Sequence, residues 1–197
     1  MKILKRIVMV LLVVVVIAVA VSFFLPAKAI LERSAVMKTS PEVTYAYLND
    51  LNNFNNWSPW HELDPNAACT ITGGPGVGQK SEWDSKVKNV GKGSMTISQS
   101  SADSIRMDLQ FGEMPTAHAG FKMEAADGGT KVTWYFEGAD AGMNPIMRWM
   151  NTMMGTFVGG DYDKGIAKLQ TVLSTYQPPM PETMPMDSTM MDSTVTK

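Results

Sequence analysis

The sequence predicts an α+β domain in which an antiparallel sheet is covered by one long C-terminal helix. Between residues 70 and 136, segments with alternating apolar and polar residues follow one another across short turns, as in an antiparallel meander. From Met147 to Tyr176 the apolar residues recur every three or four positions, as in an amphipathic helix. A sheet with one apolar face must be covered, and this helix is long enough to cover it.

The chain begins with a candidate membrane anchor at Ile7–Leu25, where Ser22 is the only polar residue. A helix of this length reaches roughly 28 Å, close to the hydrocarbon thickness of a bilayer. Lys2, Lys5 and Arg6 precede it without a nearby acid. The positive-inside rule therefore predicts that residues 1–6 are cytoplasmic, and that the domain follows a single pass through the inner membrane and faces the periplasm or cell exterior.

The alternative is a cleaved secretory signal, because Ala27-Lys28-Ala29 has the small-x-small form that signal peptidase accepts. The apolar run is longer than the roughly 7 to 15 residues of a signal core, which favours a retained anchor. Both alternatives place the domain outside the cytoplasm.

A first strand and a short helix follow the anchor. The strand is predicted at Ile30–Lys38, with a moderate apolar pattern. Thr39 and Ser40 are candidate helix caps, Pro41 suits a first helical turn, and Glu42 completes a capping box with Thr39. The helix then shows one apolar face, formed by Val43, Tyr47 and Leu51.

The meander comprises about six strands. Apolar and polar residues alternate clearly in residues 105–111, 121–123 and 132–136. The alternation is weaker in residues 70–72, 79–85 and 94–99. Asp127-Gly128-Gly129 predicts a hairpin turn between the last two strands. Asn144-Pro145 predicts the start of the final helix. Gly155, Gly159 and Gly160 each weaken that helix by about 1 kcal/mol, which predicts a kink or break.

The tail at residues 177–197 consists mainly of Pro, Met, Ser, Thr and Asp, without aromatic residues or an apolar period. Such a segment cannot repay the entropy of ordering, so it is predicted to be disordered. Its five Met residues suggest a Cu(I) site, but the tail has no Cys or His to complete one. A flexible tail is therefore favoured.

Several function classes are excluded or disfavoured. The net charge of −2 offers no basic surplus for nucleic acid. The single Cys excludes an internal disulfide and Cys-based metal clusters, and no cofactor or metal is predicted. Gly73–Ser81 is not a phosphate loop, because Gln79 stands where the lysine is required. His61, Glu62 and Asp64 are interpreted as an ordinary loop rather than a catalytic or metal site, because the only other His is His118.

Short motifs along the whole domain resemble the START-like SRPBCC superfamily, specifically its polyketide cyclase/dehydrase branch. They include Ser40-Pro41-Glu42-Val43, Asn56-Trp57-Ser58-Pro59-Trp60, Gly74-Pro75-Gly76-Val77-Gly78, Thr130-Lys131-Val132-Thr133-Trp134 and Asp163-Lys164-Gly165-Ile166. The resemblance covers about residues 30–173. It implies a START-like helix-grip fold over residues 30–176, in which a curved sheet wraps the C-terminal helix around a cavity for a hydrophobic ligand. The family pattern does not explain the Met-rich tail.

Two functions remain open. The first is a membrane-anchored binding or carrier module for a hydrophobic small molecule or lipid, without catalytic residues. The second is a cyclase- or dehydrase-type enzyme that uses the same cavity. The three clearest strands carry no inward His, Asp or Glu, which favours binding. The expected ligand-binding residues are Trp83, Met107, Leu109, Phe121, Met123, Trp134, Met147, Trp149, Met150 and Met154.

The segment Met143–Val158 is additionally hypothesised to be an adaptable lid, because it concentrates five Met residues and a Trp. Methionine side chains adapt to differently shaped apolar partners. The equally weighted alternative is that these residues complete the core, since Met is also a common gap filler.

Overall fold

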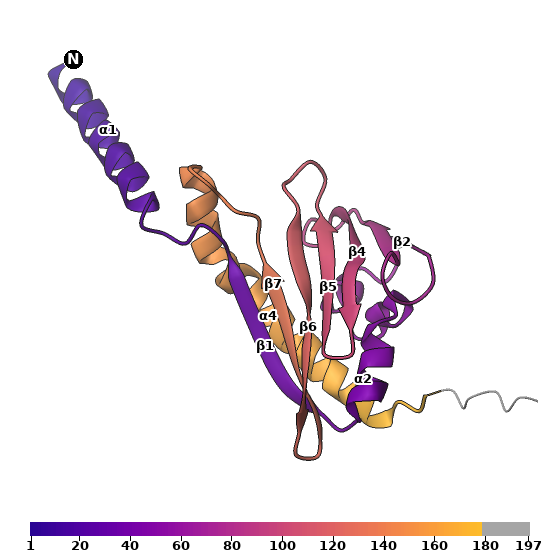
Figure 1. Ribbon diagram of the computed structural model, residues 1–197. Coiled ribbons are helices and arrows are strands. Elements are labelled where there is room, and N and C mark those ends of the chain that lie inside the picture. Colours follow the sequence, from indigo (N-terminus) through magenta and orange to yellow (C-terminus); the bar gives the residue numbers. More distant parts are fainter. Residues whose placement is uncertain (179–197) are drawn as a thin grey trace, which may run out of the picture.

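A computed structural model describes residues 1–178. The tail predicted to be disordered comprises residues 177–197, of which positions 179–197 lie outside the described residues. The elements, shown in Figure 1, are α1 (Lys2–Ser22), β1 (Ile30–Met37), α2 (Pro41–Leu48), a 3-10 helix η1 (Leu51–Asn56), α3 (Pro59–Leu63), β2 (Ala68–Thr72), β3 (Lys80–Asp84), β4 (Lys92–Ser101), β5 (Ser104–Gln110), β6 (Ala117–Ala126), β7 (Gly129–Glu137) and α4 (Pro145–Thr175).

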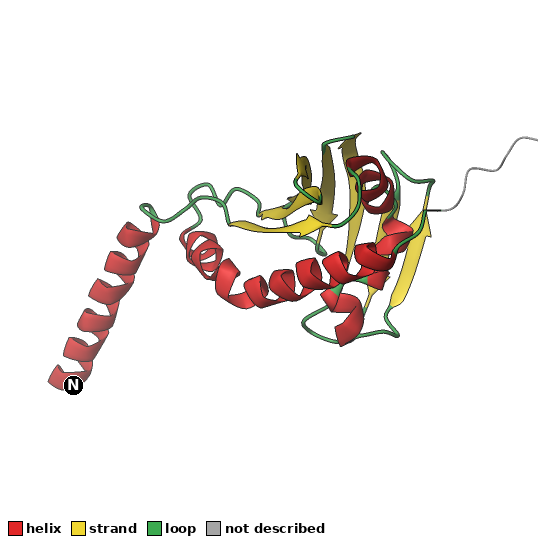
Figure 2. Cartoon of the chain, turned by 90° about the horizontal axis from the view of Figure 1, so that it is seen from below, coloured by secondary structure: helices red, strands yellow, loops and turns green. Residues whose placement is uncertain are grey.

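The seven strands form one antiparallel sheet in the order β1-β7-β6-β5-β4-β3-β2. Strands β2 to β7 are the predicted meander. The first strand joins it at the far edge, where β1 pairs with β7 from Ile30 opposite Glu137 to Met37 opposite Thr130. The sheet curves around α4, as Figure 2 shows. The predicted helix-grip architecture is confirmed.

The second half of α4 packs closely on the inner face of the sheet. Tyr162, Ile166, Leu169 and Leu173 are all buried there. A Cβ atom added at Gly165 would lie only 2.6 Å from the ring of Trp134 on β7. Glycine at this position therefore allows the helix to approach the tryptophan ring directly.

The segment from α2 to α3 covers the rest of the inner face and is held by side-chain caps. The Ser40 hydroxyl accepts a hydrogen bond from the amide of Val43 (3.4 Å) at the start of α2. Farther along, the Gln79 side chain is fully buried; its Oε1 accepts from the Leu51 amide (2.7 Å) and its Nε2 donates to Asp50 Oδ1 (2.9 Å). The segment that resembled a phosphate loop is thus a turn between β2 and β3, and Gln79 joins it to η1.

The prediction for the glycine-containing part of α4 was a kink or a break. The helix continues without interruption through Gly155, Gly159 and Gly160, so there is no break. Figure 2 shows its first turns inclined to the remainder of the helix. Contacts with the sheet hold the glycine-containing segment: Arg33 on β1 reaches within 3.1 Å of a Cβ placed at Gly159 and pairs with Asp163 at 2.5 Å. Tertiary packing therefore outweighs the low helix propensity of glycine here.

Helix α1 projects away from the domain (Figure 1). It begins at Lys2, so it includes the basic residues predicted to precede it, and it ends at Ser22. Nearly all its apolar side chains are exposed. It is long and apolar enough to span a membrane, although a signal sequence would have the same properties.

Candidate functional site

A cavity of about 310 Å³ lies between the first half of α4 and the inner face of the sheet. Its floor comes from β3, β4, β5 and β7, and its side walls come from α4 and the η1–α3 segment. Most of its surface is apolar, with side chains that include Trp60, Trp83, Met95, Leu109, Phe136 and Val158.

The cavity exists because side chains fill the space between the sheet and α4 at one end of these elements and leave it open at the other. On β5, Ile105 and Met107 are buried in the core, whereas Leu109 lines the cavity and is only partly buried. On α4, Met154 and Val158 line the cavity, and both are only partly buried. No bulky side chain from this part of the helix fills the gap.

Aromatic rings form the boundary between the cavity and the packed core. Trp134 and Tyr162 stack with ring centroids 3.8 Å apart, and Trp60 meets both rings edge-on at 5.9 and 6.0 Å. Such contacts contribute about 0.5–1.5 kcal/mol each beyond simple burial. This end of the cavity is therefore rigid.

Trp83 is fixed on the sheet side of the cavity. Its indole nitrogen donates to the carbonyl of Val90 (3.3 Å), and its ring lies across Gly93, where an added Cβ would be 2.6 Å from the ring. Phe111 meets it edge-on at 5.9 Å. Trp83 can therefore offer a fixed flat surface to a ligand.

Tyr162 contributes a hydroxyl group to the cavity wall. The residue as a whole is only 3% exposed. Within residues 1–178 its oxygen has no hydrogen-bond partner, and since no fully buried side-chain oxygen there lacks one, the hydroxyl is accessible from the cavity that Tyr162 lines. Burial raises the pKa of the phenol above its ordinary value, so the group remains protonated at neutral pH. It can donate a hydrogen bond to an oxygen of a bound molecule.

Polar side chains gather at the edge of the cavity near β2 and α3. Cys69 Sγ lies 3.5 Å from Ser81 Oγ and 3.7 Å from Asn55 Nδ2. His61 and Asp64 also line this edge, but Asp64 Oδ2 already accepts from Ser85 Oγ at 2.5 Å. In the part of the chain that the structure describes, no three His, Cys, Asp or Glu side chains converge to hold a metal ion.

The structure distributes the ten expected ligand-binding residues over three environments. Trp83, Leu109 and Met154 line the cavity. Four others are buried in the filled core: Met107, Phe121, Met123 and Trp134. The remaining three lie on the first turns of α4, where Met147 is half-buried and Trp149 and Met150 are exposed. In the segment hypothesised to be a lid, Met154 and Val158 face the cavity, whereas Met143, Met150 and Met153 are exposed.

Several cavity residues were not among those expected from the sequence. Trp60 and His61 lie in a motif that gives no sign of its position under the sheet. Tyr162 belongs to the predicted apolar stripe of α4, and Phe136 alternates with Trp134 on β7, so periodicity indicated their faces. Periodicity did not indicate at which position along each strand or helix the inward side chains border an open cavity.

Comparisons with known proteins agree with this geometry. Residues 28–174 match the family model described as polyketide cyclase / dehydrase and lipid transport. No curated protein matches the chain.

Solved structures show the same fold at low sequence identity. A Staphylococcus aureus protein of unknown function, SA2116, is 13% identical with a TM-score of 0.57, covering 75% of this chain and 94% of its own. The di-domain ARO/CYC protein StfQ from the steffimycin biosynthetic pathway is 10% identical with a TM-score of 0.55, covering 75% of this chain and 51% of its own. CV1439 from Chromobacterium violaceum is 14% identical with a TM-score of 0.50, covering 75% and 98%.

Proposed function

The chain belongs to the polyketide cyclase / dehydrase and lipid transport family, and on this basis we propose that it is a membrane-anchored module that binds or carries a hydrophobic small molecule or lipid. The cavity under α4 is the observation that supports the proposal. Its volume of about 310 Å³ lies at the small end of ligand pockets, and its apolar walls with a few polar groups match their usual composition.

The arrangement of polar groups favours an amphiphilic ligand. An apolar part would lie against Trp83, Leu109 and Val158, while an oxygen-bearing group would accept a hydrogen bond from Tyr162 or meet the polar edge at Ser81. Burying apolar area would drive binding at about 25 cal/mol per Å², and the polar groups would fix orientation.

Native mass spectrometry of the full chain, extracted with mild detergent, tests this proposal directly. We expect wild-type protein to carry a bound amphiphile. The variant Met154→Trp places an indole in the cavity and should lose the ligand. Met153→Trp adds the same group at the adjacent, exposed position and should retain it. Ligand-free wild-type protein, or equal occupancy in the two variants, would contradict the proposal.

The proposed anchor is α1, with the domain in the periplasm or outside the cell. Support comes from the length and apolar composition of α1 and from Lys2, Lys5 and Arg6 at its start. Protease added to spheroplasts should digest the domain while a cytoplasmic marker stays intact. Full protection of the domain would reverse the topology, and a mature protein beginning after Ala29 would show that the segment is a cleaved signal.

A cyclase- or dehydrase-like enzyme is the second candidate, favoured by the position of His61. The imidazole lines the cavity from α3, whereas the described strands contribute no His, Asp or Glu to the cavity lining. In this alternative His61 would move a proton on a bound polyketide-like substrate. The variant His61→Asn should then accumulate a bound species that differs from the wild-type one by the elements of water or by an unclosed ring. An identical bound species in both proteins would support binding alone.

A further inference from the structure

The first half of α4 carries a second apolar face, which points away from the cavity. Ile146, Trp149, Met150, Met153 and Phe157 are 72, 41, 49, 47 and 66% exposed. At about 100° per residue, these five positions fall within an arc of about 100°, so they form one continuous stripe. We call it the α4 apolar face. So many large apolar side chains in one exposed stripe indicate an interaction surface.

The same side of the helix becomes polar beyond Phe157. The next positions in this arc are Gly160, Lys164, Ala167 and Lys168, none of which carries a large apolar side chain. Lys168 pairs with Glu62, and Lys164 is exposed. The apolar face is therefore confined to the half of α4 that adjoins α1.

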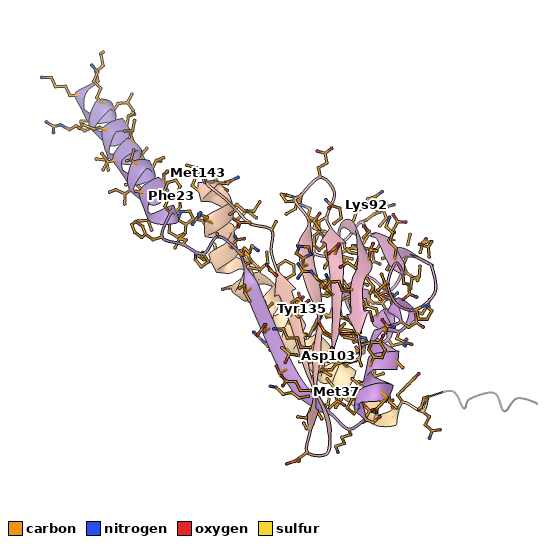
Figure 3. All side chains as sticks on the ribbon, viewed as in Figure 1. Phe23, Met37, Lys92, Asp103, Tyr135 and Met143 are labelled. Carbon is orange, nitrogen blue, oxygen red and sulfur yellow. The ribbon has the colours of Figure 1, made fainter. Side chains whose placement is uncertain are left out.

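Side-chain hydrogen bonds join this half of α4 to the end of the predicted anchor. Trp149 Nε1 donates to the carbonyl of Ala18 (3.2 Å), within the last turns of α1. Arg148 Nη1 donates to the carbonyls of Leu25 (2.8 Å) and Phe23 (3.3 Å). In Figure 3, Phe23 at the end of α1 and Met143 just before α4 mark where the two helices approach.

We infer that the α4 apolar face lies in the surface of the lipid bilayer that α1 spans. This inference rests on the anchoring part of the proposed function. The face is continuous with a lipid-exposed helix, and Trp149 and Arg148 have the chemistry of the membrane interface, where an indole or an alkyl stem is buried while a polar tip stays hydrated. Amphipathic helices of this kind lie about 5–10 Å into the interface.

This placement has a consequence for the ligand. Met154 and Val158 on the neighbouring side of the same turns line the cavity. Two turns of α4 would then be the only layer between the bilayer and the cavity wall that they form. The ligand class this geometry suits is an amphiphile that partitions into the membrane, rather than a water-soluble molecule.

Quenching by spin-labelled lipids tests the inference in the full chain reconstituted in vesicles. Three single-cysteine variants carry a nitrobenzoxadiazole label: Phe157→Cys on the face, Lys164→Cys on the polar continuation, and Val13→Cys within α1. All are made with Cys69→Ser, because Cys69 is exposed and would also react. We expect the label at positions 157 and 13 to lose most of its fluorescence, and the label at position 164 to lose little.

The outcomes separate this inference from the proposed function. Quenching at position 13 without quenching at 157 would leave the anchor intact and overturn the inference. Energy transfer between labels at 157 on different copies, without lipid quenching, would assign the face to a second copy and also overturn it. Absence of quenching at position 13 would refute the anchor and the inference together. Ligand binding is tested separately, by the native mass spectrometry experiment described above.

Discussion

The two halves of α4 cover the same sheet but pack on it in opposite ways. The half after Tyr162 is in continuous contact with the core, and Gly165 brings its backbone against Trp134. The half before Val158 stands over a cavity and exposes large apolar side chains on its other side. One helix thus combines a segment that stabilises the fold with a segment that leaves room for a ligand.

The difference arises from a few side chains rather than from the backbone, which is helical throughout. In the packed half, Trp134 fills the space beneath the helix and contacts Trp57, Trp60, Phe121 and Tyr162. In the other half, no large side chain occupies the equivalent place. Stability and ligand space can therefore be altered independently by mutation.

Removing the central ring of the packed half should have the largest effect on stability. Trp134→Ala leaves a cavity in the core and should cost about 3–5 kcal/mol of unfolding free energy, which lowers Tm by roughly 10 °C. Met154→Ala, in the hollow half, should cost less than about 1 kcal/mol because its side chain already borders empty space. Differential scanning fluorimetry of the full chain measures both. Similar losses in the two variants would refute the contrast.

Replacing a glycine with alanine should change the free energy of unfolding in opposite directions in the two halves of α4. Gly165→Ala forces a Cβ against the buried ring of Trp134 and should destabilise the protein by about 1–3 kcal/mol. Gly155→Ala meets no atom within 4 Å and should stabilise the helix by about 0.5–1 kcal/mol. Urea unfolding followed by circular dichroism compares them. If Gly155→Ala also destabilises, then this half of α4 needs glycine for a reason other than space.

Removing the Tyr162 hydroxyl, at the junction of the two halves, should lower the affinity for the ligand and leave the stability of the fold nearly unchanged. Tyr162→Phe deletes a hydroxyl that makes no hydrogen bond within residues 1–178 and is accessible from the cavity, so stability should change by less than about 0.5 kcal/mol. The lost hydrogen bond to the ligand should cost about 1 kcal/mol, or roughly fivefold in affinity, seen as lower occupancy in native mass spectra.

The matched control for this variant is Tyr45→Phe. The Tyr45 hydroxyl lies 3.0 Å from Ser100 Oγ, away from the cavity. Its removal should lower stability by about 1 kcal/mol and leave ligand occupancy unchanged. The reverse pattern in the two variants would show that Tyr162 supports the fold and does not contact ligand.

The sequence predicted the strands, α2 and α4 in the right order, and the best-placed of them have strong local signals. It missed the short helices: Leu51, assigned to the first helix, lies in η1, and His61, assigned to a loop, lies in α3. Alternation on β5 and β7, the Ser40-Pro41 cap and the period of α4 are all properties of short segments. Strand β6 was predicted too short, because its first inward residues are the small Ala117 and Ala119, which give weak alternation.

The candidate site was harder to predict from the sequence. Periodicity indicates which face of a strand is inward, and Met107 and Leu109 share that face. Only the tertiary arrangement shows that the space above Met107 is filled and that the space above Leu109 is empty. His61 was interpreted as part of an ordinary loop because the position of α3 beside the cavity depends on packing between distant segments.

The pairing of β1 with β7 has a consequence for biogenesis. In the topology proposed above, β1 would leave the membrane directly behind α1, and its partner β7 would be the last strand to emerge. Until then β1 presents unpaired backbone groups and an apolar face, a condition that favours association with other extended chains. In that topology the sheet could not close before residue 137 had crossed, and such non-local pairing folds slowly. Folding in the cell is therefore expected to be post-translocational and to depend on holding the first strand close to the membrane while the others assemble.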